Sequence, residues 1–487
     1  MKIPHITFIV DNHEYLYDRY SNEFLRINKQ LKQELKGHIR PLSILTKLQS
    51  EANILNPYTI EKFSISQFLD TKEKLVNKMY NEINQMVFIT TEECNLRCKY
   101  CVYSGSYRNV RGHNSEHILS FDTAKRAIDF FFAIAKNNFD KIIAFYGGEA
   151  LLEFQTIKNA VEYARGINKN VRFAINTNLT LLTDEILTFF VENKFVITVS
   201  LDGPKEIHDL YRITKNQKPT YDMVVRNLKK IKEYDEEYYK NHIIINTLIV
   251  PHSLEISIVD KFFSQELFNI LPIESFKTLT LNPMDNDFIK EYDYDEFYER
   301  FLTYSMEKFM NAHIKGKTDF SDMRITYNLY IRGIKTIYYR EMNRLDEYSF
   351  YWPNGICIPG LRSLLVTSDG SFFPCETLYD LKDFRVGNVQ NGFDINYISK
   401  EIEEYIKYAN TLCNECWAYR FCPHCYYSAL HKGKYSMRKK KANCHFTKTD
   451  ILNSFKMFIH IYTNNPNAFD YLNKGNAETV YKHMISD

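Results

Sequence analysis

The ten cysteines of this chain fall into two clusters, and this placement limits what the chain can fold into. Cys94, Cys98 and Cys101 lie together in the segment TTEECNLRCKYCVYSG, and the other seven lie between Cys357 and Cys444. The long stretch between the two clusters contains no cysteine. Cysteines that only fill hydrophobic cores would be scattered through the sequence. Clustered cysteines in a cytosolic protein bind metal or carry out redox chemistry.

The sequence predicts a soluble, cytoplasmic protein. No segment approaches the roughly 20 apolar residues that cross a bilayer, and the N-terminal MKIPHITFIVDNHEY turns polar too early for a signal peptide. With 62 Lys and Arg against 60 Asp and Glu, the net charge is only +2. Such a balance gives no overall field that would attract nucleic acid or an anionic membrane, so neither is expected as a partner.

Short apolar runs alternate with helical patterns from about residue 86 to about residue 282. The apolar runs are typical of parallel strands that are buried on both faces. Repeated strand–helix units close into a full or partial barrel. The expected strands are 86–90, 141–146, 171–176, 195–201, 242–250 and 276–281, and the expected helices between them include 121–135, 183–193 and 221–231.

Polar and glycine-bearing motifs follow the first four expected strands. Barrel enzymes build their sites at this rim, where parallel strands end. The three-cysteine segment follows the first strand. The motifs after the second, third and fourth strands contain Gly147, Gly148 and Glu149, then Asn178, and then Ser200, Asp202, His208 and Arg212. Each motif alone is common, but their order predicts one shared site, with His208 expected as a satisfied rim histidine.

The spacing of the first cysteine cluster is C-xxx-C-xx-C. Structural zinc needs four ligands, and no histidine stands at a suitable local spacing. Three cysteines suit a four-iron, four-sulfur cluster in which one iron lacks a protein ligand. A small molecule can bind that iron and receive an electron from it.

The three-cysteine segment resembles the signature of radical S-adenosylmethionine (SAM) enzymes, in which such a cluster binds the amino and carboxylate groups of SAM. The resemblance implies that Tyr100 packs near the adenine. It also implies that Gly147, Gly148 and Glu149 face the ammonium group of SAM. The usual Pro after this motif is Ala150 here.

The same resemblance implies further SAM contacts at the later strands. Ser200 and Asp202 contact the ribose or support their loop, and Arg212 offers a cation to the carboxylate. Asn178 is a further cofactor contact, although the Gly that usually follows is Leu179 here.

The seven C-terminal cysteines include closely spaced pairs, which would also suit two zinc sites. The set resembles the SPASM extension of radical SAM enzymes that modify peptides and proteins, which holds two auxiliary four-iron, four-sulfur clusters. By that resemblance one cluster is bound by Cys357, Cys375 and Cys425, and the other by Cys413, Cys416, Cys422 and Cys444. Only two residues separate Cys422 from Cys425, one fewer than in the family. The eighth ligand is another side chain or a site left open for substrate.

Two charged features accompany these cysteines. In sulfatase-maturing relatives an aspartate after the matching cysteine takes a substrate proton, so the resemblance implies that Glu376 is a candidate base. A surface carboxylate in a turn is the alternative. The basic run from Arg438 to Lys441 is expected to be a solvated helix face.

Residues 1–80 precede the barrel and contain no cysteine. The segments HITFIV, HEYLYD and NEFLRI are typical of short strands, and INKQLKQELKGH has helical spacing with a glycine near its end. Such a unit resembles the small domain of ribosomal-peptide maturases, where the leader of the precursor adds a strand to a sheet edge. A simple cap on the barrel is the alternative.

These features together predict an α/β protein with a partial (β/α)6 TIM-like barrel, a small α+β N-terminal domain and a cysteine-rich iron–sulfur domain. The expected ranges are 1–80 for the leader-binding-like domain, 84–330 for the barrel, 350–450 for the SPASM domain and 451–487 for a helical tail.

The resemblance implies a maturase similar to those of sactipeptides and ranthipeptides. Such an enzyme would oxidise a ribosomally made precursor peptide and join a cysteine sulfur to a carbon in a thioether. Its cofactors would be SAM and three four-iron, four-sulfur clusters, and a flavodoxin or ferredoxin would supply electrons. An anaerobic sulfatase maturase, which forms formylglycine, is the second hypothesis, and a noncatalytic metal-binding adaptor is the third.

Overall fold

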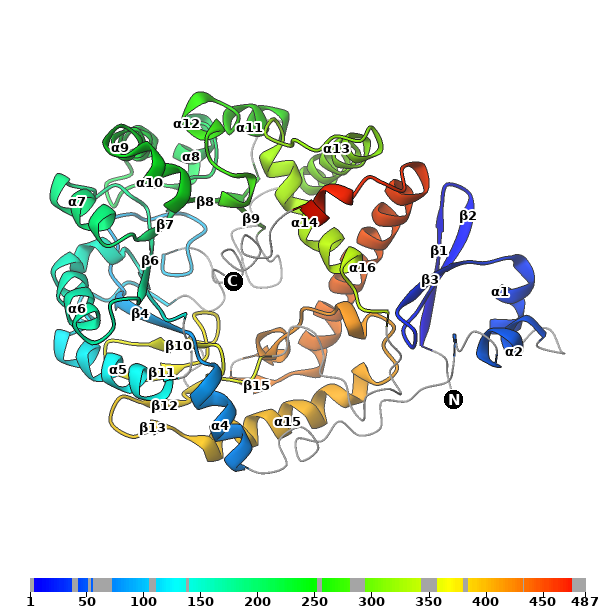
Figure 1. Ribbon diagram of the computed structural model, residues 1–487, viewed down its shortest axis with the longest axis horizontal. Coiled ribbons are helices and arrows are strands. Elements are labelled where there is room, and N and C mark those ends of the chain that lie inside the picture. Colours follow the sequence, from blue (N-terminus) through cyan, green and yellow to red (C-terminus); the bar gives the residue numbers. More distant parts are fainter. Residues whose placement is uncertain are drawn as a thin grey trace.

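The computed structural model describes residues 4–36, 43–50, 54–55, 72–104, 111–136, 140–251, 256–280, 294–342, 357–379, 384–431 and 433–474. Figure 1 shows the large sheet and its helices on one side of the molecule and the small N-terminal sheet on the other. Within the described residues, no helix is both long enough and apolar enough to cross a membrane.

A ten-stranded sheet forms the centre of the protein, in the order β13-β12-β11-β10-β4-β5-β6-β7-β8-β9. Six consecutive strands in this order run parallel, as barrel strands do. Each lies within one residue of a strand expected from the sequence, so all six expectations are confirmed. These strands are β4 (Gln85–Thr91), β5 (Ile142–Gly147), β6 (Arg172–Thr177), β7 (Val196–Ser200), β8 (Ile243–Ile249) and β9 (Phe276–Thr280).

Helices that connect these strands pack on the outer face of the sheet (Figure 1). Phe88, Phe145 and Phe173 from three neighbouring strands are almost fully buried in the same core, because strands covered on both faces need apolar residues throughout. The connecting helices are α5 (Phe121–Ile134), α6 (Phe154–Ile167), α7 (Asp184–Glu192), α8 (Lys205–Tyr211), α9 (Tyr221–Tyr234), α10 (Glu236–His242), α11 (Ile256–Phe262) and α12 (Glu266–Asn269). The expected α/β class is confirmed.

The sheet continues into the cysteine-rich region. Strand β10 (Ser363–Val366) pairs in parallel with β4, the strand that leads to the first cysteine cluster. Three short strands extend this edge in antiparallel fashion, namely β11 (Ser371–Phe373), β12 (Gly387–Asn388) and β13 (Gly392–Phe393). This pairing brings the loop of Cys375 next to the barrel rim.

Helices and one small hairpin complete the C-terminal half. The helix α16 (Met437–Asn464) carries Cys444 and continues for five turns beyond it. The domain boundary expected between residues 450 and 451 falls inside this helix, and the domain ranges remain predictions. The other elements are α4 (Lys72–Glu82), α13 (Tyr294–Ile314), α14 (Arg324–Tyr338), α15 (Ile395–Cys413), β14 (Leu430–His431) and β15 (Lys434–Tyr435).

The N-terminal segment forms the three expected strands, β1 (His5–Val10), β2 (His13–Asp18) and β3 (Glu23–Arg26), in an antiparallel sheet. The expected helix is α1 (Lys29–Leu35), and α2 (Ser43–Ser50) follows it. The glycine expected near the end of α1 lies outside the described residues. One face of this sheet packs on α16, with ring centroids 4.9 Å apart for Tyr17 and Phe455. The N-terminal sheet therefore shares a core with the C-terminal helices.

Candidate active site

The three cysteines of the first cluster lie together in the loop after β4. Cys98 is buried, and Cys94 and Cys101 are half-buried. Burial, the nearby Glu149 carboxylate and the other two thiols raise the pKa of Cys94 to about 12. The Glu149 carboxylate therefore lies near the thiol of Cys94. Metal binding would have to displace the protons of the three thiols.

Nitrogen donors surround the three sulfur atoms. Such donors stabilise thiolate ligands and tune iron–sulfur clusters, so the donor set fits a four-iron, four-sulfur cluster. Among the described residues, no three His, Cys, Asp or Glu side chains are grouped as ligands of a single metal ion. The N···S distances are 3.4 Å and 3.8 Å from Leu96 N and Asn178 Nδ2 to Cys94, 3.4 Å from Tyr103 N to Cys101, and 4.0 Å from Arg212 Nη1 to Cys98.

The glycine pair after β5 packs directly against the backbone before Cys94. A Cβ atom at Gly147 would lie 2.3 Å from the Thr91 carbonyl oxygen, and one at Gly148 would lie 2.2 Å from the Glu93 carbonyl oxygen. Gly147 also has a φ of 139°, which side-chain-bearing residues rarely adopt. Only glycine therefore fits at these two positions. The sequence motif marks a close approach of two loops.

Glu149 is buried and joins the loop after β5 to the end of β6. Its carboxylate accepts hydrogen bonds from Thr177 Oγ1 at 2.6 Å, Asn178 N at 2.7 Å and Leu151 N at 3.1 Å. Burial raises the pKa of Glu149, while these hydrogen bonds oppose the rise. Glu149 thus holds the rim loops together, and the expected role toward SAM stays a prediction.

A buried ion pair forms the opposite wall of the site. Arg212 donates from Nε to the Asp202 carboxylate at 2.9 Å, and the Tyr100 hydroxyl donates to the same carboxylate. The Arg212 guanidinium also lies over the Tyr100 ring, 5.4 Å from its centroid. Because Arg212 reaches Cys98 as well, its charge links the cysteine loop to the loop after β7. The structure thus brings together Tyr100, Asp202 and Arg212, three of the residues that the resemblance implied as SAM contacts.

The structure also shows the location and burial of the remaining residues of the rim motifs. Ser200 is the last residue of β7 and is half-buried. His208 is buried, with Nε2 3.1 Å from the Thr220 hydroxyl, and burial lowers its pKa to about 4. This agrees with a satisfied histidine. Leu179 takes the φ of 60° that a glycine would adopt easily, while its side chain is fully buried. Ala150 begins a short 3-10 helix and is buried.

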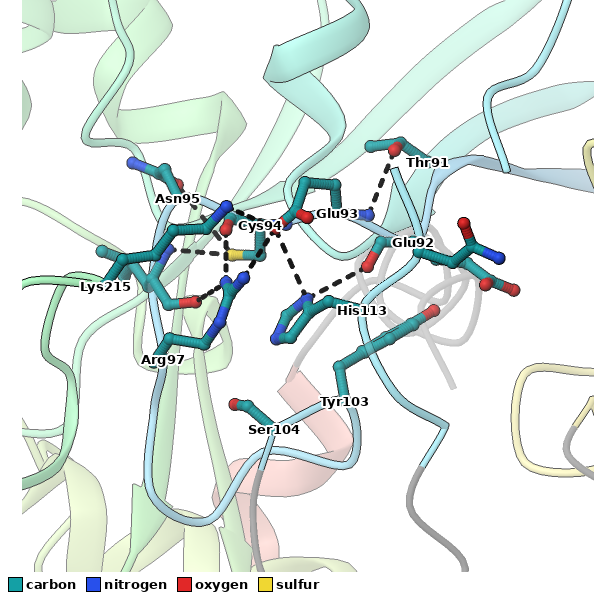
Figure 2. A network of polar contacts seen from close by, with 12 residues as sticks. Thr91, Glu92, Glu93, Cys94, Asn95, Arg97, Tyr103, Ser104, His113 and Lys215 are labelled. Carbon is teal, nitrogen blue, oxygen red and sulfur yellow. Dashed lines mark hydrogen bonds and ion pairs between the residues drawn. The ribbon is translucent and has the colours of Figure 1, made fainter. Parts of the chain in front are cut away.

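Sequence reasoning missed a charged network around Glu93, the residue before Cys94 (Figure 2). The Glu93 carboxylate accepts from Cys94 N at 2.9 Å and from Arg97 Nη2 at 2.9 Å, and it pairs with Lys215 at 3.0 Å. Burial would raise the pKa of Glu93, but these partners lower it to about 2. His113 Nδ1 lies 3.8 Å from the same carboxylate. Glu93 therefore stays ionised and fixes the start of the cysteine loop.

Electrostatic interactions connect several of the seven C-terminal cysteines. Burial, the Glu376 carboxylate and the thiols of Cys357 and Cys425 raise the pKa of Cys375 to about 12. Burial and the thiols of Cys416 and Cys444 raise the pKa of Cys413 to about 11.

Cys422 belongs to the set of Cys413. Burial and the nearby thiols of Cys413 and Cys416 raise its pKa to about 12. The electrostatic contacts thus follow the grouping that the resemblance implied, and the ligand roles themselves remain predictions.

Side chains connect the first cysteine loop with the loop of Cys375. The Tyr379 hydroxyl donates to the Glu92 carboxylate, and Arg111 donates to the carbonyl oxygen of Glu376. The Arg111 guanidinium lies 5.2 Å from the ring centroids of both Tyr103 and Tyr379. Glu376 itself is exposed. The two cysteine loops therefore border one polar, aromatic region at the barrel rim.

Comparisons with known proteins agree with this arrangement. Residues 88–255 match the family model of the Radical SAM superfamily. The cysteine-type anaerobic sulfatase-maturating enzyme of Clostridium novyi (strain NT) is 28% identical over 367 residues, which cover 70% of this chain and 86% of that protein. The serine-type enzyme of Bacteroides thetaiotaomicron is 36% identical over 151 residues, which cover 30% of this chain and 35% of that protein.

A solved structure shares the fold. Native anSMEcpe with bound AdoMet and the Cp18Cys peptide aligns with a TM-score of 0.55 and 23% sequence identity. The alignment covers 81% of this chain and 99% of that chain. The fold similarity therefore includes most of the described protein.

Proposed function

Since this chain is a radical SAM enzyme, we propose that it oxidises a cysteine-containing peptide. The product we favour is a thioether between a cysteine sulfur and a carbon in a ribosomally made precursor. One observation carries the proposal: the first cysteine loop and the loop of Cys375 border the same region, where Tyr379 contacts Glu92. A peptide side chain held there would lie between the SAM site and an auxiliary redox centre.

When bound, SAM and the triad's cluster supply a carbon-centred radical that removes a hydrogen atom, and the auxiliary clusters supply an acceptor for the second electron. The chain's own residues prepare the site for this chemistry. Gly147 and Gly148 let the rim loops approach closely, and Glu149 fixes them. Asp202 and Arg212 provide buried charges that orient a zwitterionic ligand.

The substrate side of the proposal rests on the region between the two cysteine loops. Arg111, Tyr103 and Tyr379 present a cation and two rings there, which suits a peptide backbone and its side chains. Glu376 directly follows Cys375 and is exposed, so we assign it as the base that takes the proton of the substrate thiol.

The N-terminal sheet is proposed to bind the leader of the precursor. Strands β1 and β3 each pair with β2 alone, so each leaves an edge within the described residues that another strand could extend. Hydrogen exchange tests this role. Addition of the precursor should protect backbone amides of β1 or β3, whereas protection confined to the barrel would contradict a leader-binding role.

A second candidate function is formylglycine formation in a sulfatase. The names of the Clostridium and Bacteroides relatives favour it. Both functions begin with hydrogen removal and both need the auxiliary centres. They differ in product, because a thioether loses two hydrogen atoms and consumes a cysteine thiol, whereas formylglycine from cysteine also exchanges sulfur for oxygen. Formylglycine from serine loses two hydrogen atoms as well, but it leaves every cysteine thiol free.

The deciding experiment uses the anaerobically reconstituted protein with SAM, a flavodoxin or ferredoxin as reductant, and peptides encoded by short cysteine-rich reading frames beside its gene. We expect about 11–12 iron atoms per chain, as three four-iron clusters require. Mass spectrometry should show a product lighter by two hydrogen atoms, and Cys98→Ala should give none. A sulfur-for-oxygen exchange would select the sulfatase function instead, and stoichiometric zinc with little iron would reject both.

A further inference from the structure

Lys440 is a buried lysine beside the auxiliary cysteines. It lies in the first turn of α16, four residues before Cys444, and only 1% of its surface is exposed. Lysine is almost never fully buried unless it is paired. Its neighbours Arg438 and Lys441 are exposed, as expected for the basic run, and Lys439 is half-buried. The expectation of a solvated face is therefore wrong for Lys440.

The ammonium group of Lys440 has one hydrogen-bond partner in the described structure. Its Nζ donates to the Tyr405 hydroxyl at 3.2 Å and lies 5.1 Å from the centroid of the same ring. The Tyr405 hydroxyl in turn donates to the carbonyl oxygen of Cys425 at 3.4 Å. No carboxylate of the described residues forms an ion pair with Lys440. A buried charge without a counter-charge is costly.

Lys440 lies beside residues of both auxiliary cysteine sets. Cys444 of one set stands one turn further along α16, so it lies on the same face of the helix as Lys440. The Tyr405 hydroxyl links Lys440 to the backbone carbonyl of Cys425 in the other set. His424, between Cys422 and Cys425, does not supply an opposite charge, because an imidazole ring is either neutral or positive.

Cluster binding would supply the missing counter-charge. Thiolates bound to iron and sulfide give a cluster a net negative charge, and that charge together with its surroundings sets the reduction potential. A buried cation near a cluster favours the reduced form, which carries one more negative charge. A cation between two clusters would act on both.

We infer that Lys440 is the shared counter-cation of the two auxiliary clusters and raises the reduction potential of both. The inference rests on the proposed function, because it needs those clusters. Lys440 affects the reaction only through the clusters and does not touch the substrate, so it is a positioning residue and not a catalytic one. By making the auxiliary centres easier to reduce, its charge helps them accept the electron that the substrate gives up.

Redox titration followed by electron paramagnetic resonance tests this role in the full-length, reconstituted protein. Lys440→Met removes the charge but keeps an unbranched side chain, and Lys440→Arg keeps the charge. Lys441→Met is the matched control, because it removes the same charge from the exposed neighbouring position. The SAM cluster serves as an internal reference in each sample.

We expect the auxiliary midpoints of Lys440→Met to shift to more negative values. A tenfold change in the ratio of oxidised to reduced cluster is about 59 mV for a one-electron couple. Lys440→Arg and Lys441→Met should match the wild type, and the SAM cluster should not move in any variant. Unchanged auxiliary midpoints in Lys440→Met, or equal shifts in Lys441→Met, would overturn the inference.

Iron content covers the case in which the Met variant does not assemble. Loss of auxiliary iron from both Lys440→Met and Lys440→Gln, with full iron in Lys440→Arg, would support the need for a cation. Loss from Lys440→Arg as well would overturn it in favour of a packing role. Failure of the proposed function looks different, because it shows in the wild type itself, either as missing auxiliary clusters or as a peptide product without a thioether.

Discussion

Arg19 of the N-terminal sheet donates from Nη1 to the backbone carbonyl oxygen of Asn414 at 2.6 Å, across 395 residues of sequence. In the opposite direction, Arg420 donates from Nε to the carbonyl oxygen of Arg19 at 2.8 Å. Asn414 lies between Cys413 and Cys416, which belong to the expected set of Cys413, Cys416, Cys422 and Cys444. The turn after β2 is thus hydrogen-bonded directly to the loop between Cys413 and Cys416. The N-terminal segment therefore contacts the loop that carries Cys413 and Cys416.

Replacing Arg19 with Met should destabilise this contact. The substitution removes charge-assisted hydrogen bonds from a fully buried side chain and leaves carbonyl groups unsatisfied. We expect the free energy of unfolding to fall by about 2–4 kcal/mol. Denaturant unfolding of the reconstituted protein measures the change. Arg26→Met, on the exposed end of β3, removes the same charge and should have little effect, and equal losses in both variants would argue against the contact.

Replacing Asp202 with Asn should weaken SAM binding. The change keeps the shape of the side chain but leaves the buried Arg212 cation without its carboxylate. Breaking a buried ion pair in this way costs about 3–5 kcal/mol. Calorimetry with SAM should show at least a tenfold weaker affinity. Asp222→Asn, at an exposed pair with Lys205, should bind like the wild type. Unaltered affinity in Asp202→Asn would exclude the pair from the SAM site.

Replacing Gly148 with Ala should disrupt the rim. The new Cβ would lie 2.2 Å from the Glu93 carbonyl oxygen, so the loop before Cys94 must move. We expect loss of SAM binding and incomplete iron loading, measured by dialysis and iron analysis. Gly166 in α6 provides the control because nothing lies within 4 Å of its Cβ position. Gly166→Ala should be neutral or should stabilise the helix by about 0.5–1 kcal/mol.

His313 should make stability depend on pH. It is fully buried among aromatic rings, and burial lowers its pKa from 6.5 to about 4. Because the folded protein favours the neutral ring, the contribution is complete above pH 6.5 and is lost as the pH falls toward 4. The loss amounts to about 3 kcal/mol. Urea unfolding of the wild type and His313→Gln over this range should show a steeper decline in the wild type, and parallel curves would refute the assignment.

Patterns within short segments were enough to predict the barrel. Short apolar runs located the six parallel strands from β4 to β9, because a strand buried on both faces must be apolar throughout. The glycine pair at Gly147 and Gly148 was also readable, since a close approach of two loops excludes a side chain there.

Long-range strand pairing and the burial of single side chains could not be predicted from the sequence in this way. The strand β10 has only four residues, and nothing in them indicates that it pairs with β4. Lys440 stands in a basic run, and its burial depends on Tyr405 from a distant helix. The charged network around Glu93 includes Lys215 from another loop, and this contact forms only when the chain folds.

The most direct test of the account is electron paramagnetic resonance on a variant in which all seven C-terminal cysteines are replaced by alanine. Only Cys94, Cys98 and Cys101 then remain to bind a cluster. After anaerobic reconstitution and reduction, this variant should hold about four iron atoms, and its signal should change when SAM is added. A sample without a cluster signal, or with a signal that SAM leaves unchanged, would contradict the claim that the triad forms the SAM site.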